Sequence, residues 1–126
     1  MSDALTEELL ALNQRLLDSI ERRDWEAYAA LCDPTLTAHE PEAAGHCVAG
    51  MDFHRFYFDM EVTGRPSQST ISSPHVRLMN DVAVVTYVRL RQVVDTDGSA
   101  PTRVSAETRV WQRQNGEWRH VHFHRS

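Results

Sequence analysis

Lysine is absent from this sequence, and all thirteen basic residues are arginine. Acidic residues outnumber basic ones, which gives a formal net charge of −5. A surface that binds nucleic acid or an anionic membrane needs clustered positive charge, so we expect neither kind of partner. The exclusive use of arginine is typical of a GC-rich genome and indicates a bacterial source.

Long apolar segments and cysteines are also scarce. No stretch approaches the roughly 20 apolar residues of a membrane span. The N-terminal residues 1–4 lack the basic start and apolar core of a secretory signal, so we expect a cytoplasmic protein. The two cysteines, Cys32 and Cys47, are too few for a disulfide scaffold, and we expect both to be reduced and mostly buried.

Several functional motifs are missing. The sequence has no glycine-rich G-x-G-x-x-G loop, no H-R-D and no D-F-G, so we expect no kinase activity in this chain. It has no G-x-S-x-G nucleophile elbow and no phosphate-binding loop, and no motif in it calls for a cofactor. It also lacks a basic amphipathic segment, so no calmodulin-binding segment is expected.

The residues that are present predict an α+β fold in a single domain over residues 1–126. Apolar residues at spacings of three and four predict an amphipathic helix over 4–22. Asp24 can cap a second helix ending at Leu31, and a third is expected over 52–61, broken by residues 62–67. A short extended segment over 35–39 and a loop over 40–50 lie between them. A change to a period of two predicts strands near 68–79, 82–94, 103–113 and 117–125, forming a curved antiparallel sheet around a helix.

Three arginines fall on strand faces that also present large apolar side chains. They are Arg89, Arg109 and Arg125. A two-residue turn at 115–116 would put Arg109 and Arg125 on opposite faces of the sheet. A three-residue turn, with Gly116 in the left-handed conformation, would put them on the same face, and we favour this register.

Converging guanidinium groups need negative charge. Two like charges about 6 Å apart repel by roughly 3 kcal/mol at an effective dielectric constant of 20. Glu107 and Glu40 are the candidate partners within the chain. Three interpretations remain open: internal arginine–glutamate ion pairs, a pocket for a small carboxylate or similar anion, or plain surface arginines.

The histidines offer weaker signals. His120, His122 and His124 alternate on one strand face, but no carboxylate or cysteine has an obvious place beside them, so we expect no metal site. His54 lies beside the aromatic face of the third predicted helix. It could be a general base, a donor to an anion, or a core histidine with its hydrogen bonds satisfied.

Longer motifs extend over most of the chain. They include C-D-P at 32–34, E-P-E-A at 40–43, G-M-D-F-H-R-F-Y-F at 50–58, Y-V-R-L at 87–90, E-T-R-V-W at 107–111 and V-H-F-H-R-S at 121–126. In these motifs the sequence resembles the association (hub) domain of calcium/calmodulin-dependent protein kinase II. The resemblance implies the cone-shaped nuclear transport factor 2-like fold and a homo-oligomer, a dimer at least, with assembly into rings as the larger form.

The resemblance also implies a ligand site. In that family one histidine and three arginines line a cavity that can hold small carboxylates such as γ-hydroxybutyrate, and the matching positions are His54, Arg89, Arg109 and Arg125. We therefore predict a hub-like oligomerisation protein with an anion-binding cavity. The alternative is an isomerase- or dehydratase-like enzyme of the same fold acting on an anionic substrate, with His54, Tyr57 and Glu107 as its acid–base residues and Glu40 as a further candidate.

Overall fold

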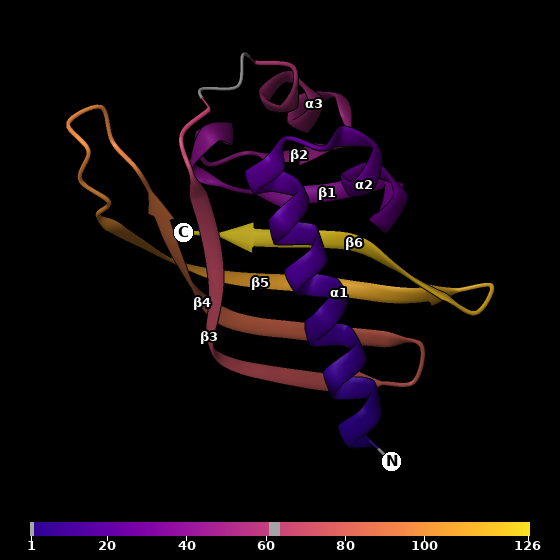
Figure 1. Ribbon diagram of the computed structural model, residues 1–126. Coiled ribbons are helices and arrows are strands. Elements are labelled where there is room, and N and C mark those ends of the chain that lie inside the picture. The colour runs from indigo at the N-terminus through magenta and orange to yellow at the C-terminus, as the bar shows by residue number, and fades with distance from the viewer. Residues whose placement is uncertain (1, 61–63) are drawn as a thin grey trace.

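The computed structural model describes residues 2–60 and 64–126. Its helices are α1 (Ser2–Arg22), α2 (Trp25–Leu31) and α3 (Asp52–Phe58), with a short 3-10 turn, η1 (Pro41–Ala43). Its strands are β1 (Cys32–His39), β2 (Cys47–Ala49), β3 (Ser67–Met79), β4 (Val82–Val93), β5 (Thr102–Gln114) and β6 (Glu117–Arg125). Helix α1 crosses one face of the sheet, while α2 and α3 lie at the end of the sheet that holds β1 and β2 (Figure 1).

One six-stranded sheet connects these strands in the order β2-β1-β6-β5-β4-β3. The predicted α+β class and the antiparallel meander β3–β6 are confirmed. The prediction was incomplete at the other edge, where β1 pairs in parallel with β6 and antiparallel with β2. The expected loop over 40–50 is therefore wrong, because it contains η1 and β2. Pairing between β1 and β6 joins residues more than 80 positions apart, and no local pattern signals it.

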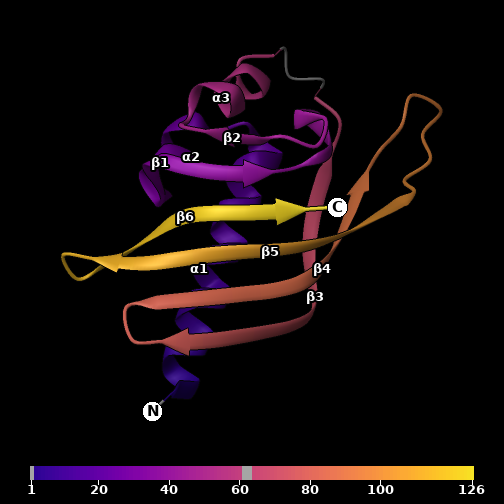
Figure 2. The same ribbon diagram turned by 180° about the vertical axis from the view of Figure 1, so that it is seen from behind.

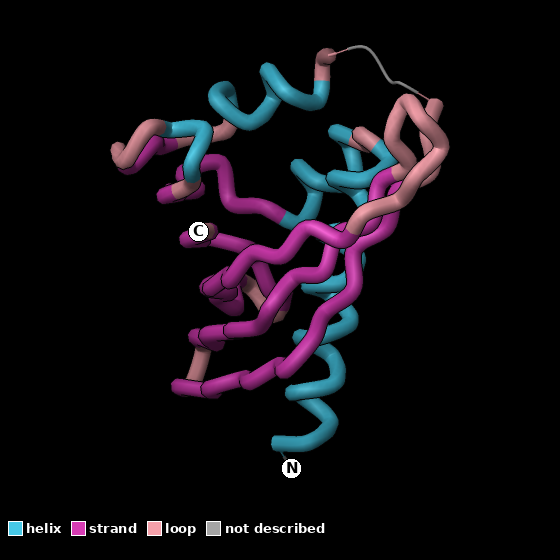
Figure 3. Tube along the Cα trace, turned by 90° about the vertical axis from the view of Figure 1, so that its left-hand side faces the viewer, coloured by secondary structure: helices cyan, strands magenta, loops and turns pink. Residues whose placement is uncertain are grey.

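The third helix is shorter than predicted. It ends at Phe58, whereas the aromatic periodicity predicted helix to Glu61, which lies outside the described residues. Part of the predicted break over 62–67 also lies outside them. The strands bend along their length, as Figure 3 shows from the side. On β3 the register shifts between Ser72 and His75, and Ser73 has a φ of 52°, which marks an irregularity that turns the strand.

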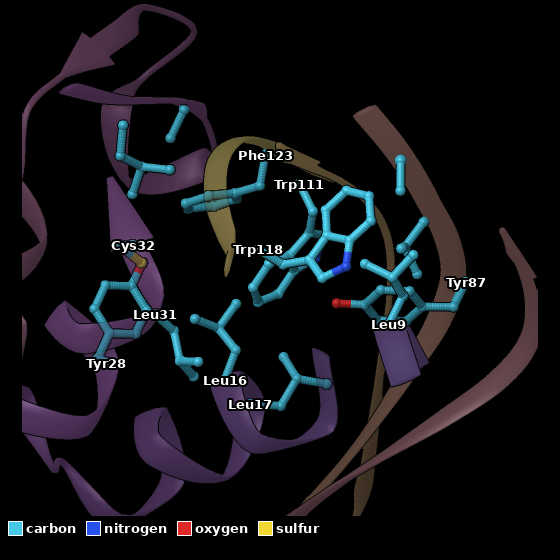
Figure 4. Packing of buried hydrophobic residues seen from close by; sticks show 14 residues of the cluster. Leu9, Leu16, Leu17, Tyr28, Leu31, Cys32, Tyr87, Trp111, Trp118 and Phe123 are labelled. Atoms are coloured by element: carbon cyan, nitrogen blue, oxygen red, sulfur yellow. The ribbon is translucent and has the colours of Figure 1, made fainter. Parts of the chain in front are cut away.

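The core lies between α1 and the inward face of the sheet. Leu9, Leu16 and Leu17 of α1 are completely buried and pack with aromatic residues from the strands (Figure 4). Asn13 shares this buried side of the helix, and its Oδ1 accepts a hydrogen bond of 3.1 Å from the indole of Trp111. The helix is thus fixed on the sheet both by apolar burial and by polar contacts, of which the Asn13–Trp111 hydrogen bond lies within the core.

The second helix begins at the predicted cap. The Asp24 carboxylate accepts a hydrogen bond of 3.1 Å from the backbone amide of Ala27. We expect Asp24→Ala to lower the free energy of unfolding by about 1 kcal/mol, because one amide at the helix start would lose its acceptor. Urea unfolding at fixed protein concentration measures this loss. Asp24→Asn keeps an acceptor and should cost much less; equal losses for the two variants would contradict the capping role.

The opposite face of the sheet has none of the described helices over it (Figure 2). On β4 and β5 this face carries uncharged side chains, with Val84 beside Val110, Val88 beside Ala106 and Leu90 beside Val104. Val104 is 67% exposed. Cys32 is buried as predicted, but Cys47 is exposed, because β2 lies at the sheet edge.

Candidate functional site

A cavity of about 260 Å³ opens between the helices at the β1 end and the inward face of β4–β6. On its helical side it is lined by Tyr28 of α2, by His54 and Tyr57 of α3, and by Glu40 and Glu42 around η1. The sheet supplies Arg89, Arg91, Arg109, Phe123 and Arg125. All four residues predicted to bind an anion therefore line one cavity.

The register that brings Arg109 and Arg125 together differs from the predicted one. Asn115 and Gly116 form a two-residue turn with φ values of 52° and 80°, so the expected three-residue turn is wrong. The convergence comes instead from a shift between Val110 and Trp111. Trp111 pairs with His120, but Arg109 pairs with Phe123, which leaves one extra residue on β6. This bulge turns the rest of β6 over and points Arg125 inward.

Arg109 is the most deeply buried arginine, with 1% of its surface exposed. Its Nη2 and Nε lie 2.9 and 3.1 Å from Oε1 of Glu107, and its Nε donates to the Tyr87 hydroxyl at 2.9 Å. The guanidinium also lies 4.3 Å from the ring centroid of Phe123. Burial raises the pKa of Glu107, but the charges of Arg109 and Arg89 outweigh it and bring the pKa to about 2. Glu107 is therefore a fixed anion.

Arg89 lies between two carboxylates. Its Nη1 is 3.2 Å from Glu107 and its Nη2 is 2.8 Å from Glu21, while its Nε donates to Ser69 at 2.8 Å. Glu21 also binds Arg91 at 2.9 Å. Burial raises the pKa of Glu21, but hydrogen bonds from Arg91 and the serines of β3 bring it to about 2.

Glu21 did not emerge from the sequence as a site residue. It lies four residues after Leu17, which is fully buried, so the inward side of α1 extends to it. The position of an acidic residue, Glu21, on the buried side of the predicted helix was the sequence signal that could have identified it as a site residue.

Arg125 is the most accessible of the three predicted arginines, with 21% of its side chain exposed. Its Nη2 donates to Glu42, whose side chain is 39% exposed and sits on the short η1 turn. Burial raises the pKa of Glu42, but the hydrogen bond and the charge of Arg125 lower it by more, so the pKa lies below its usual value. Sequence reasoning named Glu107 and Glu40 as the partners of the arginines, and it missed Glu42.

His54 and Glu40 form a separate pair in the cavity wall. His54 Nδ1 lies 3.7 Å from a carboxylate oxygen of Glu40, and both side chains are more than nine-tenths buried. Burial and the charge of Arg109 lower the pKa of His54 to about 4, so the imidazole is neutral at pH 7. Its Nε2 is buried with no hydrogen-bond partner among the described residues. A buried polar atom of this kind is costly unless something else binds it.

The candidate acid–base residues are not arranged alike. His54 and Tyr57 line the cavity, but Glu107 is held by two arginines and by the Tyr87 hydroxyl. A carboxylate whose pKa is about 2 is a weak base and carries no proton at neutral pH. The geometry thus gives Glu107 a structural role.

The prediction that the three histidines of β6 share one face is wrong, because the bulge separates them. His120 is completely buried, with Nε2 3.4 Å from Arg109 and Nδ1 3.5 Å from the Cys32 sulfur. His122 and His124 lie on the opposite face beside His39. Across residues 2–60 and 64–126, no group of three histidine, cysteine, aspartate or glutamate side chains is placed to hold a metal ion.

Helices packed on a strongly curved sheet, with a cavity between them, define the nuclear transport factor 2-like class of fold. A superfamily protein of that name from Salmonella enterica superposes on the whole chain and 92% of its own with a TM-score of 0.80, at 21% identity. Within this class, the family model for the calcium/calmodulin-dependent protein kinase II association domain matches residues 5–126. The chain belongs to the calcium/calmodulin-dependent protein kinase II association domain family.

Individual relatives agree. The chain is 47% identical to calcium/calmodulin-dependent protein kinase type II subunit delta from Oryctolagus cuniculus over 98% of its length, but it spans only 24% of that protein. The association domain of the Caenorhabditis elegans kinase superposes with a TM-score of 0.93 at 42% identity, covering 98% of this chain and 96% of that one. The hub homology domain from Chlamydomonas reinhardtii gives 0.90 at 47% identity, covering 95% of each. None of the helices described here is long and apolar enough to cross a membrane.

Proposed function

We propose that this chain is a hub-like domain that assembles with copies of itself and binds a small carboxylate or similar anion in its arginine-lined cavity. The observation that carries the anion site is the unequal pairing of the arginines. Arg89 and Arg109 are locked to the buried carboxylates Glu21 and Glu107. Arg125 is paired with Glu42, a half-exposed residue on a short turn, and this partner can be exchanged for a ligand.

The deep ion pairs set the electrostatics of the site. A ligand carboxylate that displaces Glu42 would meet the Arg125 guanidinium in the bidentate geometry that arginine favours. The cations of Arg91 and Arg109 line the same space, and the unpartnered Nε2 of His54 is a further group that a ligand or its water can satisfy. The cavity volume of about 260 Å³ suits a ligand of a few carbon atoms.

Self-association is supported by family membership and by the uncovered sheet face. Two of the similar solved structures are an association domain and a hub homology domain. The valine-rich surface of β4 and β5 offers an uncharged face to a second copy. Light scattering or native mass spectrometry at micromolar concentration should give a dimer or a larger ring. A monomer at that concentration would contradict this part of the proposal.

Ligand binding should raise thermal stability. Saturating γ-hydroxybutyrate or butyrate, at one hundred times its dissociation constant, should stabilise the fold by about 2.7 kcal/mol. Arg125→Gln should reduce the stabilisation strongly, because it removes the exchangeable cation. Arg119→Gln, a surface variant outside the cavity, is the matched control and should respond like the parent protein. Equal stabilisation of both variants would contradict binding at Arg125.

Glu42 should act as an internal competitor for the ligand. Glu42→Gln keeps the shape of the side chain but removes its charge, so Arg125 loses its anionic partner. We expect the affinity for butyrate to rise by about three- to tenfold, which corresponds to the free energy of one partly exposed ion pair of about 1 kcal/mol. Isothermal titration calorimetry measures the change. Unchanged or weaker binding would show that Glu42 and the ligand do not compete.

A further inference from the structure

Charge around the cavity is balanced before any ligand enters. The described groups are the guanidinium groups of Arg89, Arg91, Arg109 and Arg125 and the carboxylates of Glu21, Glu40, Glu42 and Glu107. When all four carboxylates are ionised, a bound carboxylate leaves one excess negative charge around the cavity, because a Glu42 displaced from Arg125 stays beside the cavity on η1. Such an excess is costly on the side of the cavity where Glu40 and His54 lie, because both side chains are more than nine-tenths buried. The cavity needs a way to remove one negative charge as the anion binds.

We propose that Glu40 takes up a proton when the anion binds, so that the cavity binds a carboxylate and a proton together. This inference rests on the proposed anion site and specifies how it is regulated. Glu21 and Glu107 each touch two arginines and Glu42 touches one. The nearest charged or titratable group that the structure gives Glu40 is the neutral imidazole of His54, at 3.7 Å.

The groups that face Glu40 come from every element packed around it. They are Tyr28 on α2, Glu42 on η1, His54 on α3, Glu107 and Arg109 on β5, and Arg125 on β6. Burial is the main effect that raises the pKa of Glu40, and the charge of Glu42 raises it further against the opposing charges of Arg125 and Arg109. A ligand carboxylate on Arg125 adds a second anion beside Glu40 and raises its pKa again.

Protonation of Glu40 also favours the tautomer of His54 that donates a hydrogen bond from Nε2. A neutral Glu40 presents an O–H toward Nδ1 of His54, from which its oxygen is 3.7 Å away. A small approach completes a hydrogen bond in which Nδ1 accepts, and the imidazole hydrogen then resides on Nε2. That nitrogen is the buried atom without a partner among the described residues. One proton thus removes a negative charge and provides a donor in the cavity wall.

Calorimetry with butyrate as the probe measures the proton directly. Titrations at about pH 6.5 in Bis-Tris and in imidazole, neither of which is an anion, should differ in heat because the wild-type protein takes up a proton from the buffer on binding. Affinity should also rise as the pH falls from about 8 to 6, by up to about tenfold per pH unit for full coupling. This measurement needs no variant and is independent of how any variant folds.

Glu40→Gln mimics the protonated carboxyl group. It should abolish proton uptake and bind butyrate at about pH 8 as tightly as the wild-type protein binds it at about pH 6. Glu117→Gln makes the same change on an exposed hairpin and should behave as wild type. Butyrate binding without proton uptake, or uptake that survives Glu40→Gln but is lost in His54→Gln, would overturn this inference and leave the anion site standing. Absence of butyrate binding at every pH would overturn both.

Discussion

Replacing Glu107 with alanine should destabilise the protein by about 3–5 kcal/mol, because the change leaves buried arginines without their anion. Glu107 is 2% exposed and accepts hydrogen bonds from Arg109, Arg89 and the Tyr87 hydroxyl. Arg109 is itself 1% exposed, so water can replace little of the interaction that its guanidinium makes with Glu107. Chemical unfolding at one fixed protein concentration measures the effect, since an oligomer's stability depends on concentration.

The matched control is Glu117→Ala. Glu117 also pairs with an arginine, Arg119, at 2.8 Å, but its side chain is 68% exposed. Removing this surface pair should change the free energy of unfolding by no more than about 0.5 kcal/mol. A similarly small loss for Glu107→Ala would mean that Arg109 is adequately solvated without Glu107, which would contradict the buried network.

The free energy of unfolding should fall progressively as the pH is lowered, beginning near neutral pH. The pKa of His54 is about 4 in the folded protein against 6.5 for a free imidazole, because burial and Arg109 disfavour its charge. Its neutral state therefore stabilises the fold above pH 6.5, and this contribution is lost as the pH falls toward 4. Burial lowers the pKa of His120 in the same direction. The folded state resists binding protons that the unfolded chain accepts.

The carboxylates extend the loss to lower pH. The pKa of Glu107 is about 2 against a usual 4.5, so its contribution of about 3 kcal/mol is present above pH 4.5 and lost as the pH falls toward 2. Glu21 acts in the same direction, and Glu40, whose pKa is raised by burial, acts in the opposite one. Thermal unfolding monitored by circular dichroism at a series of pH values measures the slope. A melting temperature that does not change between about pH 7 and pH 4 would contradict these assignments.

Local patterns were sufficient for the parts of the fold whose causes are local. The leucine spacing predicted α1, the Asp24 cap marked the start of α2, and strand alternation located the meander. Pairing of β1 with β6 could not be predicted from local patterns, because its hydrogen bonds join residues that are far apart in the sequence, such as Thr37 and His122. The end of α3 at Phe58 was also missed. The prediction treated the aromatic residues as one buried helical face, but Phe56 is 66% exposed, so their spacing did not mark how far the helix extends.

The site was predicted in its arginines but not in its pairing. Strand parity singled out Arg89, Arg109 and Arg125, and all three line the cavity, but Arg125 reaches it through a bulge that no sequence pattern indicates. Their partners were harder, because Glu21 comes from the end of α1 and Glu42 from a turn expected to be loop. A carboxylate's partner depends on three-dimensional proximity across elements, whereas alternation along one strand reports only the face on which a side chain lies.

The most direct test of an anion site at Arg125 is a crystal structure of the protein soaked with butyrate. We expect a carboxylate on the Arg125 guanidinium, inside the space bounded by Arg91 and His54, with Glu42 turned away from the arginine. A cavity that holds only water at saturating butyrate, with Glu42 still paired to Arg125, would contradict it.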